Sequence, residues 1–236
     1  MNEKKNLQLI KSGNPFVDKT WGGFYEGGTY FVIGPPKSGK TILALQYALK
    51  ANSKKDSCLY LTTFNLNDLI INSSVIDLDL QNYLDQGIIT LTRLTIPKNI
   101  KQSDDFDSEL RNYFEDLRKL IELYSPTRIV VDELSPLIKH NNLKLINELF
   151  LEFNNYLSER GITGLHLIRE DPEIFEISSS LSKLSTAYIY LFKTEELVDK
   201  LNPGTMIITP NIGHPEGKFS SKYYIEVGSG LRIISK

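Results

Sequence analysis

The chain has 236 residues, 41% hydrophobic and 24% charged, a composition typical of a folded globular protein that excludes a disordered chain, a collagen-like repeat and a bundle of membrane helices. Its 29 acidic and 27 basic residues leave a formal net charge of −2, which does not favour a nucleic-acid binder, and its single cysteine, Cys58, has no partner for an intramolecular disulfide. Residues 1–11 are charged and lack an apolar leader, and no later stretch is long and apolar enough to span a membrane, so we expect a cytoplasmic protein with no membrane partner.

From residue 30 to residue 168, short apolar runs rich in β-branched residues alternate with longer segments of helical period. The expected strands cover residues 30–33, 58–63, 88–91, 128–131 and 164–168. The expected helices cover residues 41–52, 66–71, a segment that starts after Ser103 or Asp104 and includes Ile121, and 145–157 with Gly161 as C-cap. Residues 97–103 are expected to form a polar loop. Parallel strands joined by crossover helices produce such an alternation, so we predict an α/β fold with a mainly parallel central sheet flanked by helices.

The pattern changes after Thr186, where short strands follow one another without long helical segments between them. These strands are expected at residues 187–192, 206–209, 223–227 and 231–234. Turn sequences rich in glycine, proline and asparagine separate them, which predicts an antiparallel C-terminal extension of the sheet. Because no repeat, low-complexity tract or long linker divides the chain, we predict one domain over residues 1–236.

The segment Gly34 to Thr41 reads G-P-P-K-S-G-K-T and matches the phosphate-binding pattern G-x-x-x-x-G-K-[ST] between a predicted strand and a predicted helix. In such a loop the backbone N–H groups turn inward around phosphate oxygens, and the helix N-terminus adds its positive dipole. Lys40 is expected to reach the β and γ phosphates, and the Thr41 hydroxyl to ligate magnesium. The residues expected to bind the nucleotide are Gly34, Pro35, Pro36, Lys37, Ser38, Gly39, Lys40, Thr41 and Ile42.

Asp132 ends the apolar run at residues 128–131, far downstream of the phosphate loop. This is a Walker B arrangement, in which the carboxylate holds Mg²⁺ directly or through water beside Thr41. An aspartate in this place is also common as a residue that merely ends a strand. The phosphate loop upstream favours the functional interpretation.

Residues 12–49 resemble the N-terminal signature of the RecA-like ATPases of the KaiC and RadA group. The matching segments are S-G-N-P-F-V-D at 12–18, W-G-G at 21–23, E-G-G-T at 26–29 and the phosphate loop running into I-L-A-L-Q at 42–46. The segment 223–231 also resembles the closing hairpin of the group, and single KaiC-like domains are more similar than true recombinases. The resemblance implies a RecA-like P-loop NTPase fold, ATP or ADP bound with Mg²⁺, and a homo-oligomer such as a hexameric ring or another protein partner.

The sequence departs from this group where hydrolysis is concerned. Relatives carry a glutamate pair after the second strand, and here Thr63 and Phe64 occupy the expected places, so neither side chain can activate water. Glu133, which follows Asp132, is the alternative catalytic base, although along a strand its side chain would point away from that of Asp132. Relatives also present a Lys-x-Arg pair, where this chain reads Thr-Pro-Asn at 209–211. We therefore expect slow or partner-dependent hydrolysis, with Lys40 and Glu133 as the catalytic candidates.

Other functions are disfavoured by charge. The segment 169–183 carries four acidic residues against two cations, which does not suit a DNA-binding loop, and the arginines form no cluster typical of a small-molecule kinase lid. The aromatic residues Phe16, Trp21, Phe24 and Tyr25 could stack on adenine or on another subunit, but core packing is favoured. The leading hypothesis is an ATP-controlled regulatory or assembly switch, and the alternative is a scaffold subunit that binds ATP without hydrolysing it.

Overall fold

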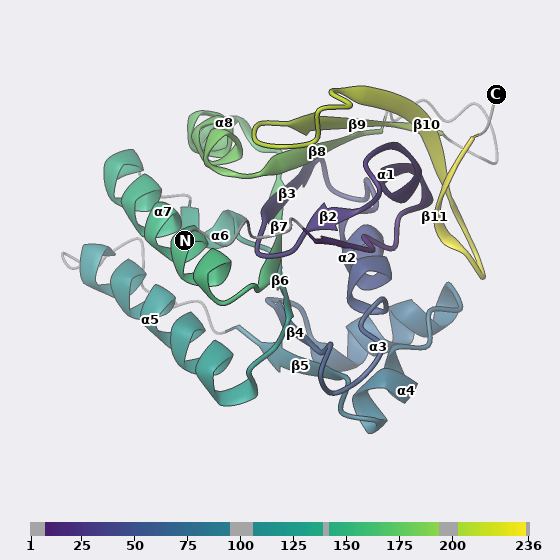
Figure 1. The fold of residues 1–236 in the computed structure, drawn as a ribbon, viewed down its shortest axis with the longest axis horizontal. Helices are drawn as coiled ribbons and strands as arrows, with labels where there is room; N and C mark the ends of the chain where they lie inside the picture. The colour runs from purple at the N-terminus through teal and green to yellow at the C-terminus, as the bar shows by residue number, and fades with distance from the viewer. Residues whose placement is uncertain (1–7, 95–105, 139–141, 194–202, 235–236) are drawn as a thin grey trace, which may run out of the picture.

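The strand β3 (Thr29–Gly34) lies inside a nine-stranded sheet and is buried along its whole length. The computed structural model describes residues 8–94, 106–138, 142–193 and 203–234, and the sheet runs through it in the order β11-β10-β9-β8-β3-β7-β6-β4-β5 (Figure 1). Five strands pair with their neighbours in parallel around β3: β8 (Ala187–Phe192), β7 (Thr163–Arg169), β6 (Arg128–Asp132), β4 (Cys58–Thr62) and β5 (Ile89–Arg93). Their carboxyl ends therefore meet at one edge of the sheet.

Alternate side chains of the buried strands supply two separate cores, because successive residues of a strand point to opposite faces. Tyr30 and Val32 belong to the core on one face, and Phe31 and Ile33 to the core on the other. The first face is covered by α2 (Lys40–Ala48), α3 (Leu66–Val75) and α4 (Leu80–Asp85), and the second by α5 (Phe106–Tyr124), α7 (Leu143–Glu159) and α8 (Phe175–Leu184) (Figure 1). Two apolar faces on each strand explain why these strands read as continuous apolar runs.

The last strands form the antiparallel extension predicted from the sequence. They are β9 (Gly204–Pro210), β10 (Phe219–Glu226) and β11 (Gly230–Ile233), and β9 pairs antiparallel with β8. The hairpin of β10 and β11 returns to the phosphate loop: the Tyr223 hydroxyl donates to the carbonyl oxygen of Ser38, and the Gln46 amide on α2 donates to the carbonyl of Ser229. The C-terminal hairpin thus packs against the phosphate loop and α2, although both lie far earlier in the sequence.

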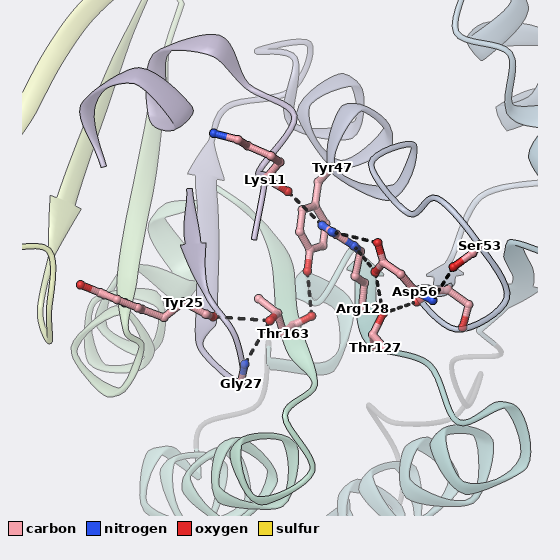
Figure 2. A network of polar contacts seen from close by, with 10 residues as sticks. Lys11, Tyr25, Gly27, Tyr47, Ser53, Asp56, Thr127, Arg128 and Thr163 are labelled. Atoms are coloured by element: carbon pink, nitrogen blue, oxygen red, sulfur yellow. Dashed lines mark hydrogen bonds and ion pairs between the residues drawn. The ribbon is translucent and has the colours of Figure 1, made fainter. Parts of the chain in front are cut away.

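The amino end of β6 is fixed by a buried arginine (Figure 2). Arg128 Nε lies 3.0 Å from Asp56 Oδ1, and its Nη1 donates to the carbonyl oxygen of Lys11 over 2.9 Å. The guanidinium also lies 5.2 Å from the ring centre of Tyr47, whose hydroxyl donates to the carbonyl of Thr163. These contacts tie the N-terminal segment and α2 to the sheet at the edge opposite the phosphate loop.

Short elements account for most differences from the sequence-based expectations. The structure adds β1 (Leu9–Ile10), α1 (Pro15–Thr20), β2 (Phe24–Tyr25), α4, α6 (Ser135–Ile138), the 3-10 turn η1 (Pro172–Ile174) and α8, none of which was predicted. The helix expected over 41–52 ends at Ala48, and the one expected over 66–71 extends to Val75. The polar loop 97–103 and the helix start at 103 or 104 lie outside the described residues. None of the helices in the described ranges has the length and apolar character needed to cross a bilayer.

The aromatic residues before the phosphate loop pack into the core at the opposite edge, as the favoured interpretation predicted. Trp21 and Phe24 are buried, and the Trp21 ring stacks on His214 with 4.3 Å between ring centres. Tyr25 also contacts the His214 ring, at 4.5 Å. These side chains belong to the packing of the N-terminal segment against the β9–β10 connection.

Candidate functional site

The phosphate loop connects β3 to α2 at the carboxyl edge of the sheet. Gly39 precedes α2 with a φ of +98°, a conformation that glycine adopts without steric cost. A Cβ on Gly34 would lie 2.5 Å from the carbonyl oxygen of Leu191, on the neighbouring strand β8, and 2.9 Å from Ser38 Oγ. Glycine at both positions therefore lets the loop turn tightly against the sheet.

A cavity of about 360 Å³, here called the phosphate-loop pocket, opens above this loop. Its lining consists of residues 36–42 together with Phe64, Glu133, Arg169 and Ile225. Phe64 follows β4, Glu133 follows β6 and Arg169 ends β7, so three neighbouring strands deliver one side chain each. Ligands of open α/β sheets bind at such a carboxyl edge.

Lys40 is buried at the first turn of α2, and its ammonium group points back into the loop. Its Nζ donates to the carbonyl oxygens of Gly34 at 2.9 Å and Pro35 at 3.0 Å. Burial lowers the pKa of Lys40, an effect opposed by the negative charges of Glu133 and Asp132. Gly34 and Pro35 thus face the lysine with their carbonyl groups, while the other seven residues expected to bind the nucleotide, 36–42, line the pocket.

Asp132 and Thr41 lie together beside the pocket. Asp132 is buried, and its Oδ2 accepts a 2.8 Å hydrogen bond from the Tyr60 hydroxyl on the adjacent strand. Burial raises the pKa of Asp132 to about 6, and hydrogen bonds from Tyr60 and Thr41 oppose that rise. A carboxylate and a hydroxyl side by side supply the oxygen ligands that Mg²⁺ prefers when phosphates complete its shell. This pair fits Mg²⁺, and no cluster of three or more His, Cys, Asp or Glu side chains in the described ranges is arranged to hold a metal by itself.

Glu133 faces the pocket, contrary to the orientation expected from an uninterrupted strand. The strand β6 ends at Asp132, and the peptide bond between the two acids is cis. The Glu133 side chain is 7% exposed, and its Oε1 lies 3.4 Å from Arg169 Nε. A buried carboxylate therefore reaches the site expected for a catalytic base, but an arginine pairs with it.

Phe64 and its neighbours supply no second carboxylate. The Phe64 side chain is 43% exposed and lines both the phosphate-loop pocket and an adjoining apolar groove of about 480 Å³ between α2 and α3. Asn65 caps α3 by accepting a hydrogen bond from the N–H of Asn67, and the Thr63 N–H donates to the carbonyl of Asp132. Phe64 thus contributes apolar surface, and Thr63 and Asn65 make hydrogen bonds that hold the local structure.

The segment that replaces the Lys-x-Arg pair lies at the other edge of the sheet. Pro210 pairs with Ala187, the first residue of β8, so the end of β9 is far from the phosphate loop of the same chain. The Asn211 amide donates to the carbonyls of Ser182 and Ser185 at the end of α8. Asn211 therefore holds two elements together and presents no positive charge.

Arg169 and Tyr60 belong to the site but were not predicted from the sequence. Arg169 directly follows the predicted strand 164–168. Ligands of α/β sheets bind at the carboxyl ends of strands, so a charged residue at the end of a strand beside the phosphate-loop strand is a candidate for the site. Tyr60 lies inside a predicted strand, and its contact with Asp132 depends on which strands become neighbours. The sequence carries no local sign of that contact.

Comparisons with known proteins point to one family. A family model described as "ATPase: KaiC" matches residues 10–195. The circadian clock protein KaiC2 of Synechocystis sp. is 30% identical over 166 residues, which cover 69% of this chain and 28% of KaiC2. KaiC3 of the same organism is 22% identical over 167 residues, covering 70% of this chain and 31% of KaiC3. The match thus spans less than a third of the length of these curated relatives.

A solved structure extends the likeness to nearly the whole fold. A KaiC-like protein from the hyperthermophilic archaeon Pyrococcus horikoshii superposes with a TM-score of 0.71 at 18% identity. The superposition covers 97% of this chain and 100% of that one. The α/β fold predicted from the sequence, a RecA-like sheet with an antiparallel C-terminal extension, is therefore confirmed.

Proposed function

Because the chain belongs to the KaiC family of ATPases, we propose that it binds ATP with Mg²⁺ in the phosphate-loop pocket and acts as a nucleotide-controlled switch. The observation that carries this proposal is the juxtaposition of Thr41, at the start of α2, with the buried carboxylate of Asp132 at the end of β6. A phosphate loop and a Walker B acid give a P-loop enzyme its function only when they meet, and here they come from segments far apart in sequence.

Each side chain has a distinct part in binding. The N–H groups of the phosphate loop and the Lys40 ammonium group hold the β and γ phosphates, and the carbonyls that now accept from Lys40 keep it inside the loop. Thr41 and Asp132 hold the magnesium ion, with Tyr60 orienting the carboxylate. Bound Mg²⁺ supplies positive charge against the phosphate oxygens. Glu133 is the proposed acceptor of a proton from the attacking water.

We propose that hydrolysis is slow or needs a partner. No carboxylate stands at positions 63 and 64, which costs about 10² to 10⁴ in rate where such a base is required. The sequence at 209–211 offers no cation to a neighbouring subunit, and a cationic finger contributes about 10³ to 10⁵ in rate. The pairing of Glu133 with Arg169 further reduces the availability of the remaining base.

Nucleotide control of assembly or of partner contact is the second part of the proposal. Large apolar side chains are exposed at the edge of the pocket and in the groove that adjoins it, namely Phe64 at the edge and Val75 on α3, and Ile71 on the same helix is also exposed. Such a patch suits contact with another protein surface, and a second copy of the chain, as in a hexameric ring, is the proposed occupant. Measuring the native mass with and without Mg-ATP tests this part, and a mass that never exceeds the monomer under either condition contradicts it. A cytoplasmic location and one domain over residues 1–236 stay predictions.

The competing function is a scaffold subunit that binds ATP without turnover. Phe64 in the place of a carboxylate and the Glu133–Arg169 pair favour it. A DNA-recombination role receives less support. The segment that would approach DNA forms η1 and α8, and Glu173 and Glu176 in their first turns carry the same sign of charge as DNA phosphates.

Thermal unfolding with and without Mg-ATP tests the binding site directly. Mg-ATP at 100 times its Kd stabilises the folded protein by about 2.7 kcal/mol, which raises the Tm of a chain of this size by about 5 to 10 °C. Lys40→Ala is expected to abolish this shift, because it removes the buried ammonium group that faces the phosphates. Lys144→Ala is the matched control, since Lys144 is 88% exposed and its ion pair within the described part of the chain is with Glu148 at 3.8 Å. An equal Tm shift in Lys40→Ala and in the control would contradict the site assignment.

A further inference from the structure

We propose that Arg169 is a phosphate sensor that acts within its own chain, exchanging its partner Glu133 for the γ-phosphate when ATP binds. The exchange frees Glu133 to accept a proton from water and lets the site distinguish ATP from ADP. This inference rests on the proposed nucleotide site. It assigns to Arg169 the positive charge that residues 209–211 do not supply.

The backbone around Arg169 is anchored to the phosphate loop on one side and to the segment after β6 on the other. Arg169 is the residue of β7 that pairs with Gly34, the first residue of the loop. The Glu170 N–H donates to the carbonyl of Gly34 over 2.9 Å, and this carbonyl also accepts from Lys40 Nζ. The Arg169 N–H donates to Ser135 Oγ over 2.7 Å, directly after the segment that carries Asp132 and Glu133. The position of the Arg169 backbone relative to the phosphate loop is therefore fixed by the sheet itself.

The side chain of Arg169 is partly exposed, whereas its backbone is anchored. It is 47% exposed and lines the phosphate-loop pocket, and its Nε lies 3.4 Å from Glu133 Oε1. Among the described residues the guanidinium makes no hydrogen bond that meets the usual geometry, so most of its five N–H donors are available for another anion. An anion that enters the pocket meets these donors beside Lys40.

Charge and geometry favour the exchange when a γ-phosphate is present. A terminal phosphate carries more negative charge than one carboxylate and offers three oxygens, and guanidinium groups bind such oxygens in bidentate pairs. ADP lacks this group, so with ADP the pair Arg169–Glu133 is retained. With ATP, Arg169 moves to the γ-phosphate, and Glu133, which is 7% exposed, is left as a buried carboxylate without its ion-pair partner. The pair is thus sensitive to the one group that distinguishes the two nucleotides.

Binding of Mg-ATP and Mg-ADP to wild type, Arg169→Gln and Arg169→Lys, measured by calorimetry, tests this role. A hydrogen bond to a charged group accounts for about 10- to 100-fold in affinity, so Arg169→Gln should weaken Mg-ATP by that factor and change Mg-ADP by less than about threefold. Arg169→Lys should recover part of the loss, because it keeps the charge without the planar fork. Arg118→Gln is the control: Arg118 is also partly exposed and pairs with Glu115 at 3.1 Å, but it lies on α5.

The outcomes separate the sensor from the site on which it depends. Wild-type protein that binds both nucleotides, with Arg169→Gln weakening both equally or neither, overturns the sensor role and leaves the nucleotide site standing. Wild-type protein that binds neither nucleotide overturns both. A purely structural ion pair predicts a further difference: Arg169→Gln would then lower the Tm without changing the ratio of the two affinities, and that ratio decides the question even if the variant is less stable.

Discussion

The hydroxyl of Tyr60 donates a 2.8 Å hydrogen bond to Asp132 Oδ2 across the pairing of β4 with β6. Both residues are buried, so the bond fixes the orientation of a carboxylate that has little access to water. The Thr41 side chain also bonds this carboxylate. A proposed magnesium ligand is therefore oriented by a residue of a neighbouring strand that does not line the phosphate-loop pocket.

Tyr60→Phe should weaken the affinity of the ATP-bound site for Mg²⁺ by about tenfold, because partners that orient a metal ligand account for 10- to 100-fold in metal affinity. The measurement is the Mg²⁺ concentration that gives half of the ATP-induced rise in Tm. Tyr113→Phe is the matched control, since the Tyr113 hydroxyl is also buried but has no hydrogen-bond partner among the described residues. An unchanged midpoint for Tyr60→Phe would show that this hydrogen bond does not orient a metal ligand.

Glu133→Gln decides between the slow ATPase and the scaffold. If Glu133 accepts the proton of the attacking water, the substitution removes the base and should lower phosphate release by about 10² or more at saturating Mg-ATP. Binding should persist, because Lys40, Thr41 and Asp132 are untouched. Steady release that disappears in Glu133→Gln excludes the scaffold, and wild-type release equal to that of buffer alone excludes the enzyme.

Arg128→Met should destabilise the fold without affecting nucleotide binding. The Arg128 side chain is 4% exposed and pairs with Asp56 at 3.0 Å, so the substitution leaves a partly buried carboxylate without its partner (Figure 2). Loss of one member of such a pair costs about 3 kcal/mol or more in the free energy of unfolding, measurable by urea denaturation. The affinity for Mg-ATP should stay within about twofold, since Arg128 begins β6 and Asp132 ends it. A large loss of affinity in a folded variant would contradict this separation of the two edges.

The parts of the site that depend on local pattern were predictable from the sequence. The phosphate loop has a fixed spacing, and Asp132 follows a strand that is recognisable because it is apolar on both faces. What failed were features that depend on tertiary neighbours. Arg169 enters the site because β7 lies beside β3, and Glu133 turns toward the pocket because β6 ends one residue earlier.

The helix α8 gives the acidic residues of the segment 169–183 a local structural role. Its sequence is rich in serine, a residue that favours turns and caps, but Ile177 and Leu181 give it one apolar face that packs on the sheet. Glu173 and Glu176 lie where its first turns begin, and acids are favourable at that end of a helix. Residues that read as a loop unsuited to DNA therefore have a local structural reason to be acidic.

The pH dependence of stability should report on His166, which the sequence analysis did not place in the site. Its ring lies 5.4 Å from that of Phe31 and 6.1 Å from that of Phe153, and neither ring nitrogen has a hydrogen-bond partner among the described residues. Burial lowers the pKa of His166 to about 3. The folded protein therefore keeps this ring neutral at pH values where the unfolded chain, with a histidine pKa near 6.5, binds a proton.

As the pH falls below about 6.5, the unfolded chain gains a proton that the folded chain does not, so stability is lost progressively until about pH 3. The loss approaches about 1.4 kcal/mol per pH unit, or about 2.5 kcal/mol between pH 6.5 and 4.5. His166→Leu removes this contribution while keeping a similar side-chain volume. Urea unfolding of both proteins between pH 7 and 4.5 should therefore show that wild type loses about 2.5 kcal/mol more stability than His166→Leu on acidification, because the other titrating groups, including His214 and Asp132, are common to both. Curves that stay parallel over this range would mean that His166 is protonated in the folded state or is not buried as described.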